Sequence, residues 1–80
     1  MKKMGYFAED NQIKTISLKE VVKVIQVDKV YRYPGIPEFI LYENRIYPVI
    51  EKFSESGYCI ILKNGRVILT PKIKGGGNDG

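Results

Sequence analysis

The sequence predicts a small, mostly-β fold, and three observations support this. A chain of 80 residues buries only about 60% of its unfolded surface, which is enough for one core. Its apolar residues fall in five to seven short runs separated by turn-forming residues, a pattern typical of strands. Asn64 and Gly65 between two such runs are a strong hairpin signal. Because the chain is too small for a two-sheet sandwich, we expect one SH3-like β-barrel of five to seven short strands with one short helical turn, over residues 1–73.

Two strands open the chain around a polar turn. Residues 3–8 and 13–16 carry apolar side chains that favour strands, and the polar residues 9–12 favour a turn between them. We therefore expect an N-terminal hairpin.

The next segment has two interpretations. Ser17 and Glu20 have the spacing of a capping box, in which a hydroxyl and a carboxylate satisfy backbone donors at a helix start, and this predicts a short helix over residues 18–23. The β-branched side chains within residues 21–25 favour a strand over residues 21–30 instead. The helix is our prediction and the strand is the alternative.

A proline-rich connection is expected near the middle of the chain. Pro34 and Pro37 bracket Gly35, and each proline fixes its own φ and biases the preceding residue toward extended geometry. Residues 31–37 should therefore form a stiff, exposed link that ends regular structure on both sides.

Two further strands are expected on either side of a tight turn. They cover residues 38–42 and 45–51, and the turn falls at Glu43 and Asn44 because asparagine tolerates positive φ. Pro48 has no N–H to donate to a ladder, so it indicates an edge position or a bulge.

A last hairpin is expected around Asn64 and Gly65. This pair favours a type I′ turn, with positive φ at both residues, between strands over residues 58–63 and 66–70. Residues 74–80 are mostly glycine with polar residues and cannot offset their ordering entropy, so we expect a disordered tail.

Charge and composition argue against catalysis. The net charge is +4, with seven basic and five acidic side chains in residues 1–40 and six and four in residues 41–80, which is typical of a solvated surface. Glu51 and Glu55 lie near lysines and are expected to be salt-bridged or solvated. The chain has no His, the commonest general base and a frequent metal ligand, and no phosphate-binding glycine motif. We expect no catalytic residue, no metal site and no cofactor.

The sequence predicts a cytoplasmic protein without membrane insertion. No apolar run approaches the roughly 20 residues of a membrane span, and Lys2 and Lys3 are not followed by the apolar region of a signal peptide. Cys59 is the only cysteine, which fits a reducing compartment, and we expect a small buried strand residue rather than a reactive thiol. Abundant Lys, Ile, Val and Tyr resemble a thermophile's usage.

The aromatic residues are the remaining candidates for function. Tyr31 and Tyr33 flank Arg32 on the stiff connection, where burial is least assured, and a rigid tyrosine on a loop is a common interface anchor. These rings either anchor a partner or pack over the mouth of the barrel.

Four blocks within residues 6–73 occur in an order and approximate spacing known from one family. An aromatic strand, a strand ending in Ile, and an acidic-Val-x-x-Val pattern are carried by Tyr6, Phe7, Ile16, Leu18, Glu20, Val21 and Val24. A Pro-x-x-Pro link with acidic and aromatic residues, an Ile-Pro-Val-Ile-like strand and a later apolar strand are carried by Pro34, Pro37, Glu38, Phe39, Tyr47, Pro48, Val49, Ile50 and residues 58–62. Together they resemble the CheW-like domain of bacterial chemotaxis coupling proteins and of CheA kinases. Family members usually have two linked barrels and a longer segment near residues 40–46, whereas this chain has material for about one barrel.

The resemblance implies a non-catalytic adaptor in chemotaxis signal transduction. Its partner would be a CheA-type histidine kinase, a CheW-type protein, a chemoreceptor or, in a homodimer, a second copy of the chain. We expect the docking face at Tyr33, Ile36, Phe39 and Tyr42, where rigid prolines would hold apolar side chains exposed at low ordering cost. The alternative for Ile36 and Phe39 is ordinary core closure.

A second class of function uses some of the same aromatic rings. A small basic barrel would bind single-stranded nucleic acid by stacking bases on tyrosines while cations contact phosphates. The residues for this role are Tyr31, Tyr33, Tyr42, Lys29, Arg32 and Arg45. Binding that falls steeply with salt would distinguish it. A scaffolding subunit of a larger enzyme is a third possibility.

Overall fold

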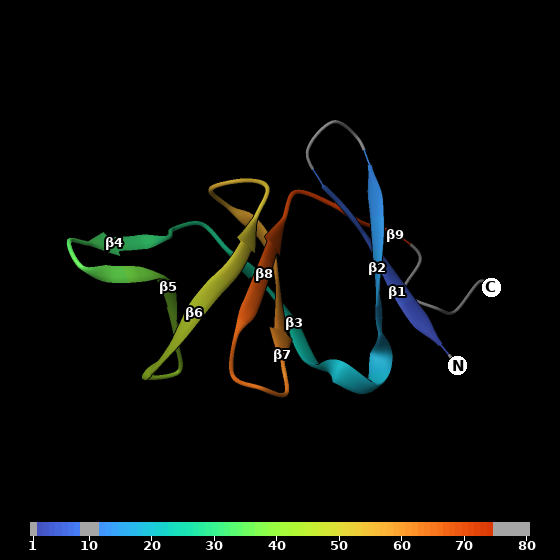
Figure 1. The fold of residues 1–80 in the computed structure, drawn as a ribbon, viewed down its shortest axis with the longest axis horizontal. Coiled ribbons are helices and arrows are strands. Elements are labelled where there is room, and N and C mark those ends of the chain that lie inside the picture. The colour runs from blue at the N-terminus through green and yellow to red at the C-terminus, as the bar shows by residue number, and fades with distance from the viewer. Residues whose placement is uncertain (1, 9–11, 75–80) are drawn as a thin grey trace.

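The computed structural model describes residues 2–8 and 12–74 and contains two β-sheets (Figure 1). The smaller sheet has the strand order β2-β1-β9 and the larger one β3-β7-β8-β6-β5-β4. The strands are β1 Lys3–Phe7, β2 Ile13–Ser17, β3 Val21–Val27, β4 Tyr31–Tyr33, β5 Ile36–Tyr42, β6 Arg45–Lys52, β7 Gly57–Leu62, β8 Val67–Thr70 and β9 Ile73–Lys74. With 67% of the structure in strands, the predicted mostly-β fold class is confirmed. The described ranges hold more strands than the expected five to seven, because β4 was predicted as a connection and β9 was not predicted, its Lys74 being assigned to the tail.

The β7–β8 hairpin is the centre of the fold, since both of its faces are buried. One face joins a first core cluster formed by Val30, Ile40, Cys59, Ile61, Val67 and Leu69. The other face joins a second cluster, shared with the smaller sheet, formed by Met4, Tyr6, Ile60, Leu62 and Ile68. Successive side chains of a strand point to opposite faces, so burial on both faces explains why these two strands are continuous apolar runs.

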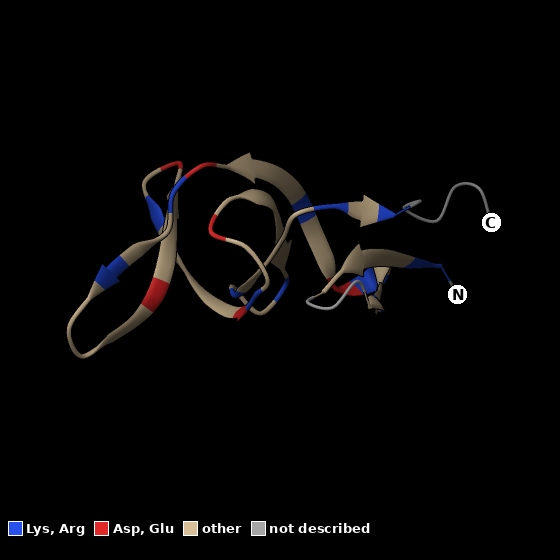
Figure 2. Ribbon diagram, turned by 90° about the horizontal axis from the view of Figure 1, so that it is seen from above, with Lys and Arg blue, Asp and Glu red and all other residues tan. Residues whose placement is uncertain are grey.

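The larger sheet curls around the first core cluster in a barrel-like way (Figure 2). The ammonium of Lys23 on β3 lies 5.4 Å from the ring centroid of Tyr42 on β5, although three strands separate β3 from β5 in the hydrogen-bonded order. The first half of β6 pairs with β5 as far as Pro48, and its second half pairs with β8 from Val49, with a register shift before Glu51. Pro48 therefore lies where the strand changes partner and next to an irregularity, as its missing N–H indicated.

The type I′ turn expected at Asn64 and Gly65 is found instead at Glu43 and Asn44, between β5 and β6. Glu43 and Asn44 both have positive φ, 49° and 66°, which is the signature of a two-residue type I′ turn. In the β7–β8 turn only Gly65 has positive φ, and its N–H donates to the carbonyl of Leu62 at 3.0 Å. This geometry fits a three-residue loop, a type I turn followed by a glycine bulge. The hairpin prediction is confirmed and the predicted type I′ turn at Asn64 is wrong.

The predicted helix over residues 18–23 is wrong beyond its first turn. A 3₁₀ turn covers only Leu18–Glu20, and the side chain of Ser17 accepts a hydrogen bond from the backbone N–H of Lys19 at 3.3 Å. From Val21 the chain continues as β3, in agreement with the alternative. The β-branched run prefers the pleated strand, where its side chains keep their favoured rotamers.

The stiff connection over residues 31–37 is also corrected. Tyr31–Tyr33 form β4, and β5 begins at Ile36, so the segment is a hairpin rather than a break. Pro34 and Gly35, with a φ of 79° at Gly35, are the residues that a type II turn places at its centre. The two prolines therefore shape a turn between paired strands.

Thr70 and Tyr6 tie the smaller sheet to the larger one. The buried hydroxyl of Thr70 donates to the carbonyl of Phe7 at 2.6 Å. The hydroxyl of Tyr6 donates to a carboxylate oxygen of Glu51 at 2.9 Å, and Lys14 pairs with the same carboxylate at 3.1 Å. Burial, followed by the Glu51 hydrogen bond, raises the pKa of Tyr6 to about 12. Glu51 is salt-bridged, as expected.

The ends of the chain and the first turn are only partly described. Lys74, predicted in the tail, belongs to β9, where it pairs with Gly5, while residues 75–80 of that tail lie outside the described residues. The same holds for residues 9–11 of the predicted polar turn. Within residues 2–8 and 12–74, no helix has the length and apolar character required to cross a membrane.

Candidate protein-binding surface

The strands β4, β5 and the first half of β6 form a unit that we call the arm. Its outward side is an apolar surface, which we call the arm face. Strand pairing sets Tyr31 opposite Phe39, Phe39 opposite Pro48, and Leu41 opposite Ile46. Residues paired in this way, and residues two apart on a strand, share one face of a sheet. The arm face comprises Tyr31, Tyr33, Phe39, Leu41, Ile46 and Pro48.

The inward side of the same strands is apolar as well. Ile40 belongs to the first core cluster, and Tyr42, Tyr47 and Val49 pack against it. A sheet with one face on a core usually shows polar residues on the other face. Here Leu41 is 52% exposed and Ile46 is 62% exposed, so the outward face presents apolar side chains to solvent without an internal structural reason.

Three aromatic rings organise the part of the arm face nearest the β4–β5 turn. The rings of Tyr31 and Phe39 stack with centroids 5.4 Å apart, and that of Tyr33 lies tilted 5.9 Å from Phe39. Phe39 is buried, with 8% of its surface exposed, while Tyr33 and Ile36 are each 55% exposed. The tyrosines thus cover Phe39 and offer their own outer surfaces.

Of the four residues predicted as a docking face, two are exposed in the structure and two are covered. Tyr33 and Ile36 are exposed near the tip of the hairpin, in keeping with a docking role. Phe39 is buried, which agrees with the alternative of core closure, and Tyr42 lies half-buried on the inward side against the first core cluster. Because Phe39 and Tyr42 are three residues apart on one strand, they point to opposite faces.

Sequence reasoning missed Leu41 and Ile46, two members of the arm face that are more than half exposed. A signal was present in the sequence. Residues 39–42 and 46–50 are apolar without alternation, and such a run requires apolar side chains on both faces of a strand. In β7 and β8 both faces are buried, whereas in β5 and β6 one of them is exposed.

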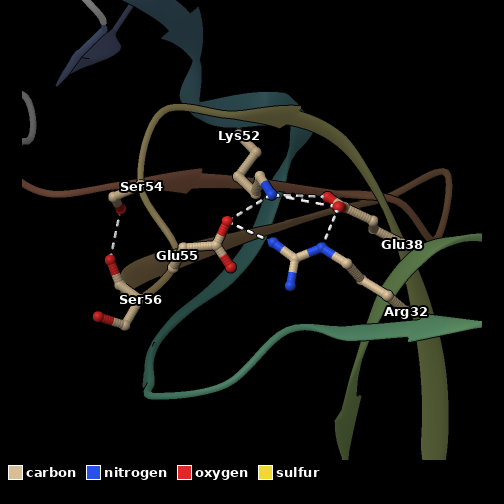
Figure 3. Close-up of polar contacts among 6 residues, drawn as sticks. All are labelled: Arg32, Glu38, Lys52, Ser54, Glu55 and Ser56. Atoms are coloured by element: carbon tan, nitrogen blue, oxygen red, sulfur yellow. Dashed lines mark hydrogen bonds and ion pairs between the residues drawn. The ribbon is translucent and has the colours of Figure 1, made fainter.

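A network of ion pairs, which we call the brace, holds the arm from its inward side (Figure 3). It consists of Arg32 on β4, Glu38 on β5, Lys52 on β6 and Glu55 in the following loop. Lys52 Nζ lies 3.0 Å from Glu38 and 2.7 Å from Glu55. Arg32 Nε lies 2.6 Å from Glu38, and its guanidinium also pairs with Glu55. Two cations meet two carboxylates, so the network has no net charge, and the salt-bridged role expected for Glu55 is confirmed.

The brace should titrate in acid. Hydrogen bonds from Lys52 and then Arg32 lower the pKa of both Glu38 and Glu55. A carboxyl whose pKa is lower in the folded state adds stability above its unfolded pKa, and this is lost as the pH falls through the folded pKa. We expect carboxyl-carbon NMR titrations of Glu38 and Glu55 to show midpoints below the ordinary glutamate value, and Lys52→Gln to raise both. Midpoints identical in the wild type and in Lys52→Gln would mean that the ion pairs do not form in solution.

The residues considered for nucleic-acid binding at the arm do not form one basic surface. The charge of Arg32 is neutralised by two carboxylates, and Tyr42 is on the inward side under Lys23. Lys29 lies 4.8 Å from the ring centroid of Tyr31. The arm is therefore better suited to an apolar partner than to a polyanion.

Residues 2–8 and 12–74 contain no cluster of three His, Cys, Asp or Glu side chains that would hold a metal. Cys59 is fully buried, as predicted, and burial raises the pKa of its thiol to about 12, far from the range of a reactive cysteine.

Comparison of the chain with protein-family models, with curated proteins and with solved structures finds no match.

Proposed function

We propose that this protein is a non-catalytic interaction module that acts as a CheW-like adaptor, docking its arm face against a barrel of a CheA-type kinase or a CheW-type protein. One observation carries the proposal: β5 and β6 are apolar on both faces, and on the outward face Leu41 and Ile46 are left exposed to solvent. Exposed apolar patches of this kind on small domains mark protein interaction sites.

The arm face can supply binding energy with little loss of conformational entropy. Complete burial of a Leu or Ile side chain contributes about 1.5–3 kcal/mol, so Leu41 and Ile46, each about half exposed, would contribute roughly 1 kcal/mol apiece on contact. Both lie on paired strands, and the brace fixes the arm from behind. Little conformational freedom is then lost on binding.

The resemblance to CheW-like domains supports this location. Its proline block, with Pro34 and Pro37, builds the β4–β5 turn and the start of β5. Its Tyr47–Ile50 block lies on β6. Two of the four resembling blocks therefore form the arm itself.

Ile46→Lys should weaken partner binding about tenfold or more, because it places a charge in the centre of a dehydrated contact. The measurement is an NMR titration of isotope-labelled protein with the regulatory domain of a CheA-type kinase at physiological salt, with shifts expected at Tyr33, Leu41 and Ile46. Val22→Lys is the matched control, since Val22 is 61% exposed on β3 and outside the arm face.

Two outcomes would contradict this proposal. Absence of shifts at high partner concentration would exclude kinase docking. Equal weakening by Ile46→Lys and Val22→Lys would show that the arm face is not the contact. Shifts of arm-face residues that depend on the concentration of the protein alone would instead assign this surface to a homodimer.

A further inference from the structure

The smaller sheet has an outward face that the proposed adaptor role does not use. On β1, Met4 and Tyr6 point inward to the second core cluster, so Lys3, Gly5 and Phe7 point outward. This sheet and the arm lie at opposite ends of the long axis of the molecule (Figure 1). A ligand on this face would therefore not compete with a partner on the arm face.

Strand pairing places basic and apolar groups together on this outward face. Gly5 pairs with Thr15 on one side and with Lys74 on the other. Phe7 pairs with Ile13, and its backbone N–H donates to the carbonyl of Lys72 at 2.9 Å. We call this surface the lysine face, and it comprises Lys3, Gly5, Phe7, Ile13, Thr15, Lys72 and Lys74.

The charge of the lysine face is not compensated within the described residues. Lys3, Lys72 and Lys74 are exposed, and the ion pairs found in residues 2–8 and 12–74 involve only Lys14, Arg32 and Lys52 among the cations. Figure 2 shows basic residues at the start of β1 and on both sides of the middle of the short C-terminal strand β9. The brace thus pairs its charges, whereas Lys3, Lys72 and Lys74 form no ion pair with any residue in 2–8 and 12–74.

Gly5 has no side chain of its own at the centre of the lysine face, and its neighbours pack closely over it. A Cβ at this position would lie 3.4 Å from Cγ2 of Ile13 and from the carbonyl oxygen of Lys74, so these two residues border Phe7 on this face. Phe7 is half-buried, with the ammonium of Lys72 5.4 Å from its ring centroid. A partly exposed aromatic ring on the same face as exposed lysines is an arrangement that takes a flat π-system with a neighbouring anion.

We propose that the lysine face binds single-stranded nucleic acid, with one base against Phe7 and the phosphates near Lys3, Lys72 and Lys74. Lys72 then moves from the ring to a phosphate, where the charge interaction is stronger than a solvent-exposed cation–π contact. A single strand fits better than an acidic peptide because a base can stack on Phe7, and better than a duplex because its bases are free to do so.

The test is fluorescence anisotropy of the full chain with labelled oligo-dT and oligo-U over a range of salt concentrations. Three phosphate contacts predict that log K falls with log salt with a slope of about −2. Phe7→Leu should weaken binding about tenfold by removing the stacking ring. Lys74→Gln should lower affinity and reduce the magnitude of the slope by about 0.7.

Matched controls separate this site from general attraction to a basic protein. Lys63→Gln removes the same charge at the β7–β8 turn, away from the lysine face, and should leave the slope unchanged. Lys72→Gln provides a second variant should Phe7→Leu lower fold stability. Ile46→Lys should not reduce oligonucleotide binding, so failure of the adaptor proposal and failure of this one give different results.

Three results would overturn the proposal. The first is absence of binding at low salt. The second is equal loss of affinity in Lys63→Gln and Lys74→Gln. The third is displacement of the oligonucleotide by polyglutamate at equal charge concentration with no effect of Phe7→Leu, which would assign the face to acidic proteins.

Discussion

Ile60→Ala is expected to lower the free energy of unfolding by about 2–5 kcal/mol, the range for removing three carbons from a fully buried side chain. Ile60 has no exposed surface and lies in the second core cluster between β7 and the smaller sheet. Because the free energy of unfolding of small domains is only about 5–15 kcal/mol, this one substitution should remove a large share of the stability. Urea denaturation followed by far-UV circular dichroism measures the change.

Ile46→Ala is the control for this experiment. The same side chain is truncated on a strand, but Ile46 is mostly exposed, so the loss should stay within about 0.5 kcal/mol. Similar losses for the two variants would mean either that the smaller sheet does not pack on β7 or that the arm face is covered in solution.

Gly57→Ala is expected to be the second strongly destabilising substitution. Gly57 has a φ of 130°, and a Cβ there would lie 2.7 Å from the carbonyl oxygen of Thr70 and 3.3 Å from Cα of Pro71. Backbone strain alone costs about 1–3 kcal/mol for a non-glycine residue. The clash is with backbone atoms, which cannot rotate away, so the measured loss in thermal or urea denaturation should exceed that range.

Gly65→Ala measures the cost of backbone strain at positive φ without a steric clash. Gly65 also has positive φ, 86°, but no atom lies within 4 Å of a Cβ built there, so this variant should lose only about 1–2 kcal/mol. Equal losses for Gly57→Ala and Gly65→Ala would show that β7 and β8 separate enough at Thr70 to admit a methyl group.

The strand content was predictable from the sequence because it follows from local patterns. Apolar runs of the right length marked β5 to β8, and Glu43 with Asn44 marked a tight turn. The helix over residues 18–23 failed because a capping residue can start only one turn when a β-branched run follows. The prolines at 34 and 37 suggested an end to regular structure, yet a proline and a glycine at the centre of a turn are compatible with paired strands on both sides.

The candidate surface was less predictable because it depends on register. Tyr33 and Ile36 were identified from the rigidity of their segment. Leu41 and Ile46 become neighbours only when β5 and β6 pair, and the brace joins residues as far apart as Arg32 and Glu55. Such contacts leave no local pattern in composition or periodicity.

The change of partner along β6 has a mechanical consequence for the arm. β4 and β5 are hydrogen-bonded to the rest of the larger sheet only through the first half of β6, and that strand turns to β8 directly after Pro48. The arm can therefore move relative to the rest of the larger sheet by bending at one strand, β6, and the ring of Pro48 restricts backbone rotation at that point. Force that a partner applies at Leu41 and Ile46 is borne by this single strand and by the four side chains of the brace, not by an entire sheet. The brace then transmits that force to the loop that contains Glu55.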